Sequence, residues 1–258
     1  MSDLVTSLIV VACVFAGGGV GLQMHRVLPP HHLAKETLDV VRLGTGMVSV
    51  LASLVFGLLI ATAKSGSDAA DHAMRAYAAD TILLDRTLRS YGPEAAKSRD
   101  LLRRSTERTL RDLWPEPGEA FIGINDPSAD DLLARAQEAI EVLRPTGPQQ
   151  TWLQQQALQQ GSSLVRQRWL LIEQAGPNVR PMILIVLVMW TVAIFVSFGL
   201  NAPRNATVVG AFLIISLAIG RAVFLILEMD SQFEGFLRLS ELPLRNALAQ
   251  LGREVGGT

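Results

Sequence analysis

The chain has 258 residues, of which 49% are hydrophobic and only 18% are charged, and its formal net charge at pH 7 is −1. Interspersed charges that nearly cancel give no reason to expect nucleic acid as a partner. Cys13 is the only cysteine, so disulfides and thiolate metal sites within one chain are excluded.

The first apolar segment covers residues 4–23 and contains no Asp, Glu, Lys or Arg. About twenty helical residues are enough to cross a hydrocarbon core of roughly 30 Å. The segment is too long for a signal-peptide core, and Asp3 precedes it where a signal peptide has basic residues. We therefore expect a retained transmembrane helix. Its glycines, Gly17 to Gly19 and Gly21, are typical of close helix packing.

The link that follows, residues 24–42, contains His25, His31 and His32 beside prolines. Paired histidines can bind a metal or sense pH. No carboxylate or thiolate partner lies at ligand spacing, however, which favours an ordinary interfacial loop.

The second apolar segment, residues 43–63, has the most informative pattern in the chain. Its small residues recur every three or four positions and so form one stripe along a helix: Gly46, Ser49, Ser53, Gly57 and Ala61. Such a stripe lets helix backbones approach closely in lipid. The alternative is that this face lines a pore around a symmetry axis. The pore-lining residues would then be Thr45, Ser49, Ser53, Phe56 and Ile60, with the last two as an apolar constriction.

Residues 64–180 contain most of the charges and form an aqueous domain long enough to have a core of its own. Apolar residues recur with helical spacing over 68–91, 93–114, from 127 onward and over about 149–174. Gly92-Pro93 and the prolines between 115 and 127 are breakers. No alternating pattern predicts a strand.

A second pair of apolar segments covers residues 181–200 and 206–227. Arg221 is the only charge within them, and ionisable residues inside membrane spans are often functional. It lies close to the end of its span, so its side chain can also extend to the interface or pair with Glu228, seven residues later.

Three carboxylates follow the last span at Glu228, Asp230 and Glu234. They could bind a hard cation such as calcium, or form a gating site. Solvated interfacial acids are the alternative, and the spacing does not match the twelve-residue calcium loop. No firm metal site is predicted, and no cofactor is expected apart from this cation.

These features together predict an all-α membrane protein with four transmembrane helices per protomer, two before and two after a helical extramembrane domain. The expected divisions are 1–63, 64–180, 181–227 and a C-terminal helical tail, 228–258. An even number of spans places both termini on the same side as the middle domain. Basic residues near the span ends do not decide which side that is. No catalytic motif occurs, so we expect no enzymatic activity.

Two segments carry a family resemblance. Residues 43–73, LGTGMVSVLASLVFGLLIATAKSGSDAADHA, with 78–102, AADTILLDRTLRSYGPEAAKSRDLL, resemble a group of bacterial membrane proteins called bestrophin-like. Residues 224–248, FLILEMDSQFEGFLRLSELPLRNAL, resemble the C-terminal signature of the same group, which is distantly similar to true bestrophins.

The resemblance implies a homopentameric ion channel in the bacterial inner membrane, with cytoplasmic termini and a cytoplasmic helical domain. Its partners would be copies of itself, membrane lipid and small inorganic ions. The second span would line the pore at Ser49, Ser53, Phe56 and Ile60. Glu228 and Asp230 would stand where the animal channels bind calcium.

Two functions remain open from the sequence. The first is an oligomeric channel with its pore on the symmetry axis, because four spans are few to enclose a water-filled path. The second is a non-conducting membrane scaffold or sensor whose helical domain binds a partner, with the small stripe used only for packing. Water access to the stripe separates the two.

Overall fold

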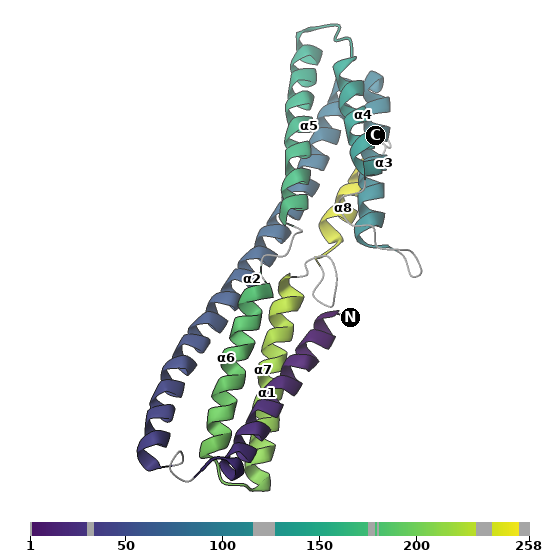
Figure 1. Cartoon of the computed structure of the whole chain (residues 1–258). Coiled ribbons are helices and arrows are strands. Elements are labelled where there is room, and N and C mark those ends of the chain that lie inside the picture. The colour runs from purple at the N-terminus through teal and green to yellow at the C-terminus, as the bar shows by residue number, and fades with distance from the viewer. Residues whose placement is uncertain are drawn as a thin grey trace. The chain divides into compact units, whose positions relative to one another are not determined.

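The computed structural model is built of helices (Figure 1). It describes residues 2–29, 34–115, 127–174, 179, 181–230 and 239–252, and none of these lies in a strand. The helices are α1 (Ser2–Val27), α2 (Lys35–Tyr91), the short 3-10 helix η2 (Pro93–Ala95), α3 (Ala96–Leu113), α4 (Pro127–Glu141), α5 (Pro148–Gln174), α6 (Pro181–Asn201), α7 (Ala206–Asp230) and α8 (Leu242–Leu251). The all-helical fold predicted from the sequence is confirmed for the described residues.

The chain divides into two compact units. The membrane unit contains Met1–Ser67 and Pro177–Leu237, and the helical unit contains Asp68–Gly176 and Arg238–Thr258. Helix α2 contributes to both, because it continues through Lys64 without a break. Residues from Arg238 onward group with the helical unit, whereas the sequence had suggested a separate tail from residue 228.

Four helices are long and apolar enough to cross a membrane, namely α1, α2, α6 and α7. A helix satisfies its backbone N–H and C=O groups internally, which is what a segment in lipid requires. Within the membrane unit α1 packs against both α6 and α7. The four predicted apolar segments are therefore four helices that share one unit.

Two clusters of buried apolar side chains hold the membrane unit together. The first joins α2 to α6 and α7 and consists of Ala52, Leu59, Ala63, Val179, Leu187, Ile194 and Ile226. The second joins α1 to α6 and α7 and consists of Val10, Val14, Leu184, Phe195, Phe212 and Val223. Phe56 on α2 packs against both clusters. Large apolar side chains elsewhere on these helices, such as Leu8, Met182 and Ile214, are exposed, as expected of a surface that faces lipid.

Glycines allow α1 and α6 to approach closely. A Cβ atom added to Gly199 on α6 would lie 2.7 Å from the backbone nitrogen of Leu22 and 2.8 Å from the Cα of Gly21. A Cβ atom on Gly18 would lie 2.7 Å from the ring of Phe212. All three distances are too short for a side chain, so the close packing expected of the first span's glycines is confirmed at Gly18 and Gly21, whereas a Cβ atom added to Gly19 would meet nothing within 4 Å.

The helical unit contains the last part of α2 together with α3, α4, α5 and α8. Helix α3 packs against α4 and α8, and α4 packs against α5. Gly92 ends α2 with a φ of 127°, a conformation that glycine adopts without steric cost, and Pro93 begins η2. The predicted helix end at Tyr91 and the predicted helix start at Pro127 are both confirmed.

Candidate functional site

The membrane part of α2 has three distinct faces. The packed face contacts α6 and α7 and consists of Val48, Ala52, Val55, Leu59 and Ala63. On the far side lies a row of large apolar residues, all strongly exposed: Leu43, Met47, Val50, Leu54 and Leu58. At 100° per residue, the small-residue stripe falls between these two faces. The packed face contacts α6 and α7, and lipid can cover the large apolar row. The small stripe is the remaining face, and what covers it must be found.

The small stripe is open within the protomer. Gly46, Ser53, Gly57 and Ala61 are exposed, and no atom would lie within 4 Å of a Cβ added to Gly46 or Gly57. Gly18 on α1 and Gly199 on α6 show the opposite. The space that a side chain would fill there is occupied by the Phe212 ring at Gly18 and by backbone atoms of α1 at Gly199. The stripe is therefore not used for packing inside one protomer.

The hydroxyl groups predicted to line a pore differ in their contacts. Thr45 donates a hydrogen bond of 2.7 Å to the Ser197 hydroxyl, and Ser197 is buried on α6. Ser49 and Ser53 donate to backbone carbonyls one turn earlier on α2, at 2.8 and 2.9 Å. Thr45 thus faces α6 inside the protomer, whereas Ser53 faces open space.

The two residues predicted to form the constriction are also separated. Phe56 is partly buried between the two apolar clusters of the membrane unit. Ile60, one turn later, is 39% exposed and lies on the open side of the helix. Of the two, Ile60 is the side chain available to a neighbouring protomer or to a pore.

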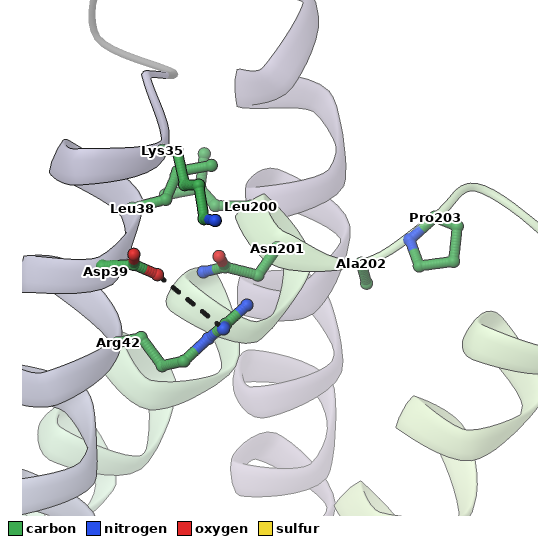
Figure 2. Close-up of a pocket in the computed structure, with 8 residues that line it drawn as sticks. All are labelled: Lys35, Leu38, Asp39, Arg42, Leu200, Asn201, Ala202 and Pro203. Atoms are coloured by element: carbon green, nitrogen blue, oxygen red, sulfur yellow. Dashed lines mark ion pairs between the residues drawn. The ribbon is translucent and has the colours of Figure 1, made fainter.

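A cavity of about 510 Å³ lies at the start of α2, beside the end of α6. It is lined by Lys35, Leu38, Asp39, Arg42, Leu200, Asn201, Ala202 and Pro203. Figure 2 shows the polar ends of the α2 residues and of Asn201 directed toward the same space. The guanidinium of Arg42 lies 3.9 Å from the Asp39 carboxylate. Sequence reasoning missed this site, although the spacing of Lys35, Asp39 and Arg42 already indicates one helical face.

The charged residues near the end of α7 lie in contrasting environments. Arg221 is exposed, whereas Glu228 is only 3% exposed and Asp230 is also buried. The Asp230 carboxylate accepts a hydrogen bond of 3.1 Å from the backbone N–H of Val179. Glu234 lies outside the described residues, as do His31 and His32. The predicted cation or gating site and the Arg221–Glu228 pair therefore stay predictions.

No group of three or more His, Cys, Asp or Glu side chains that could hold a metal ion occurs among the residues the structure describes. The carboxylate of Asp230 is already used to fix the backbone at Val179, which is a structural role. The described part of this region thus contains two buried carboxylates, those of Glu228 and Asp230.

The helical unit contains a polar network formed by one residue from each of four helices, in which Tyr77, Thr109 and Arg168 are buried and Asp130 is partly exposed. Arg168 on α5 is 2% exposed and donates to the Thr109 hydroxyl on α3 at 3.0 Å and to the Asp130 carboxylate on α4. Tyr77 on α2 hydrogen-bonds to Arg168 and Thr109. Burial raises the pKa of the Tyr77 hydroxyl, and the Arg168 guanidinium opposes part of that shift. The network joins four helices through hydrogen bonds and an ion pair, which is typical of a structural role.

Comparison with known proteins adds one finding. A model of the bestrophin-like domain family matches residues 12–244, which include α2, α6 and α7 in full, α1 from residue 12 onward and most of the helical unit. Neither a search of curated proteins nor a search of solved structures found a match. The four apolar helices and the family match together identify the chain as an integral membrane protein that belongs to the bestrophin-like family.

Proposed function

We propose that this protein is a homo-oligomeric, bestrophin-like ion channel in which α2 of each protomer lines a pore on the symmetry axis. The family supports a channel at the coarse level, and transport of small inorganic ions by a non-enzymatic mechanism fits the absence of any catalytic motif in the sequence. By resemblance the assembly is a pentamer in the bacterial inner membrane.

The proposal depends on one observation, the open small-residue stripe of α2. Ser49 and Ser53 donate their protons within α2, but a stripe of glycine and serine with no neighbour in its own protomer leaves a shallow groove and the acceptor lone pairs of the serine oxygens, which lipid chains do not hydrogen-bond. Water in a pore or helices of another protomer would satisfy them. An axial arrangement supplies both, because the same face of each protomer then meets the axis and its neighbours.

The arrangement of spans follows from the same proposal. Helices α1, α6, α7 and the membrane part of α2 would each cross the bilayer once, two before and two after the helical domain. Both termini and the helical domain would then lie on one side, which the family resemblance assigns to the cytoplasm. Lys35 and Arg42 would lie on the opposite side.

The constriction of the pore is assigned to Ile60. Its side chain is exposed on the open face, and a ring of isoleucines can gate a pore by expelling water. Phe56 packs within the protomer, so its role would be to hold α2 in place. Ser49 and Ser53 would be the wetted hydroxyls on the side of the ring toward Arg42.

Three adjacent positions on α2 test whether the stripe is wet. After replacement of the exposed native Cys13 by serine, cysteines are placed singly at Ala52, Ser53 and Leu54, which lie on the packed, open and large apolar faces. A charged methanethiosulfonate reagent attacks thiols that water reaches. We expect rapid reaction at Ser53→Cys and slow reaction at Ala52→Cys and Leu54→Cys, for the protein reconstituted in lipid.

The outcomes separate the two functions that the sequence left open. Slow reaction at all three positions would mean that the stripe is sealed by neighbouring helices, and this favours the scaffold or sensor and rejects the pore. Reaction at Ser53→Cys that blocks an ionic current would support the channel. The three substitutions are on consecutive residues, so depth in the membrane cannot explain a large difference among them.

A further inference from the structure

The cavity at the start of α2 lies in line with the small-residue stripe. Arg42, Gly46, Ser49 and Ser53 follow one another at spacings of four, three and four residues, so they share one helical face. Lys35 and Asp39 continue this line toward the N-terminal end of the helix. The cavity is therefore at the head of the stripe, where a solute would approach a pore lined by α2.

The cavity has an excess of positive charge. Lys35 and Arg42 line it, and among the described residues Asp39 is the only carboxylate that does so, since Glu36 in the same turn of α2 is not part of the lining. The Arg42 side chain is 70% exposed, and its contact with Asp39 is a long 3.9 Å. An exposed ion pair of this kind contributes little free energy. The guanidinium can therefore turn to another anion at small cost.

The dimensions favour an anion with more than one charged group. Lys35 and Arg42 are seven residues apart, which places their Cα atoms roughly 10 Å from each other along the helix. Both side chains are long, and Figure 2 shows their charged ends directed into the same space. A guanidinium forms paired, charge-assisted hydrogen bonds to phosphate oxygens, and an ammonium binds a second phosphate as a point charge.

We propose that this cavity binds a polyvalent oxyanion of the phosphate class, held between Lys35 and Arg42. Because the site is in line with the stripe, an anion bound there obstructs conduction, and this second statement depends on the proposed channel function. The phosphate groups could belong to a free solute or to the headgroup of an anionic lipid. Binding itself does not require that the protein conduct ions.

Inorganic pyrophosphate is the probe for the binding test, and the full-length protein is studied in nanodiscs of neutral phosphatidylcholine by isothermal titration calorimetry. We expect Arg42→Gln to weaken binding by about threefold or more, as for loss of one partly exposed ion pair. Asp39→Asn removes the competing carboxylate, so it should strengthen binding. Arg204→Gln is the matched control, because Arg204 is an exposed cation of the membrane unit that lines a different cavity.

Lower pyrophosphate affinity in Arg42→Gln and higher affinity in Asp39→Asn, with unchanged affinity in Arg204→Gln, would establish the site. Absence of pyrophosphate binding, or equal affinity in the wild type, Arg42→Gln and Asp39→Asn, would overturn it. Since the two substitutions lie on the same exposed turn, a general loss of folding would weaken binding in both and could not reproduce the expected opposite signs.

Two further arms identify the source of the phosphate and separate this inference from the channel proposal. In nanodiscs that contain phosphatidylglycerol, a large loss of pyrophosphate affinity would assign the site to lipid headgroups, and unchanged affinity would assign it to a soluble anion. In reconstituted bilayers, pyrophosphate should reduce the current of the wild type but not of Arg42→Gln. Binding without any current in either protein would leave the site in place and reject the channel.

Discussion

At the scale of single residues, the glycines of the membrane unit divide into two classes. Gly18, Gly21 and Gly199 are small because another segment of the same protomer occupies the space of a side chain. Gly46 and Gly57 are small although that space is empty. Sequence spacing alone describes both classes as small-residue stripes, and only the neighbours distinguish them.

Alanine substitutions test this division. Gly199→Ala places a methyl group against the backbone of α1, so we expect a loss of about 1–3 kcal/mol, as for overpacking of a close contact. Gly57→Ala adds the same methyl group to an open face and should leave protomer stability unchanged or slightly higher, since alanine favours a helix. Thermal unfolding of the two variants in detergent, followed by circular dichroism, measures the difference. Equal destabilisation would show that the open face is packed after all.

At the scale of elements, helix ends in the helical unit were predictable and the continuity of α2 was not. Gly92-Pro93 and Pro127 act locally, through backbone conformation and a missing N–H, so their positions can be read directly. The change from apolar to polar residues at Lys64 suggested a boundary. This change means that the helix suits lipid before Lys64 and water after it. No proline occurs there to interrupt the backbone hydrogen bonds, so the helix continues.

The candidate site was predictable only in part for a related reason. Helical spacing placed Thr45, Ser53 and Phe56 near one side of the second span, but periodicity does not say where a neighbouring helix lies. Contact with α6 takes Thr45 and Phe56 out of the open face. The cavity beside Arg42 needs the end of α6 as its second wall, and that pairing is not encoded in local sequence.

The four-helix network around Arg168 predicts how the helical unit responds to alkaline pH. Burial raises the pKa of Tyr77, and burial together with the Glu94 carboxylate raises that of Tyr91. An unfolded tyrosine loses its proton near pH 10, whereas the folded ones retain it. The free energy of unfolding therefore falls as pH rises above about 10, and below that pH the two tyrosines do not lower it.

This pH effect can be measured without ambiguity because the chain contains two tyrosines only. We expect the absorbance of tyrosinate at about 295 nm to appear above pH 10 and to coincide with loss of helical signal. Tyr77→Phe should make the fall of the unfolding temperature above pH 10 less steep, while Arg168 keeps its bonds to Thr109 and Asp130. Full ionisation of both tyrosines near pH 10 in the folded protein would contradict the assignment.

At the scale of the whole molecule, conduction would depend on side chains that single protomers leave exposed. Ile60→Ala should raise single-channel conductance, because it removes part of an apolar ring and leaves the protomer core intact. Phe56→Ala should instead lower stability, by about half of the ~4 kcal/mol that a fully buried phenylalanine contributes. Recordings in planar bilayers and unfolding in detergent give the two readouts. The assignment fails if conductance rises with Phe56→Ala and not with Ile60→Ala.

The contact between Gly21 and Gly199 also has a consequence for biosynthesis. Helix α1 leaves the ribosome before its partner α6, which follows only after the entire aqueous domain has been translated. At ordinary rates of synthesis this interval is roughly 10 to 30 seconds. During that time the glycine groove of α1 lies in the bilayer without its final neighbour. Chains interrupted after the aqueous domain would retain this groove uncovered, and with it small residues that favour contacts between helices in lipid.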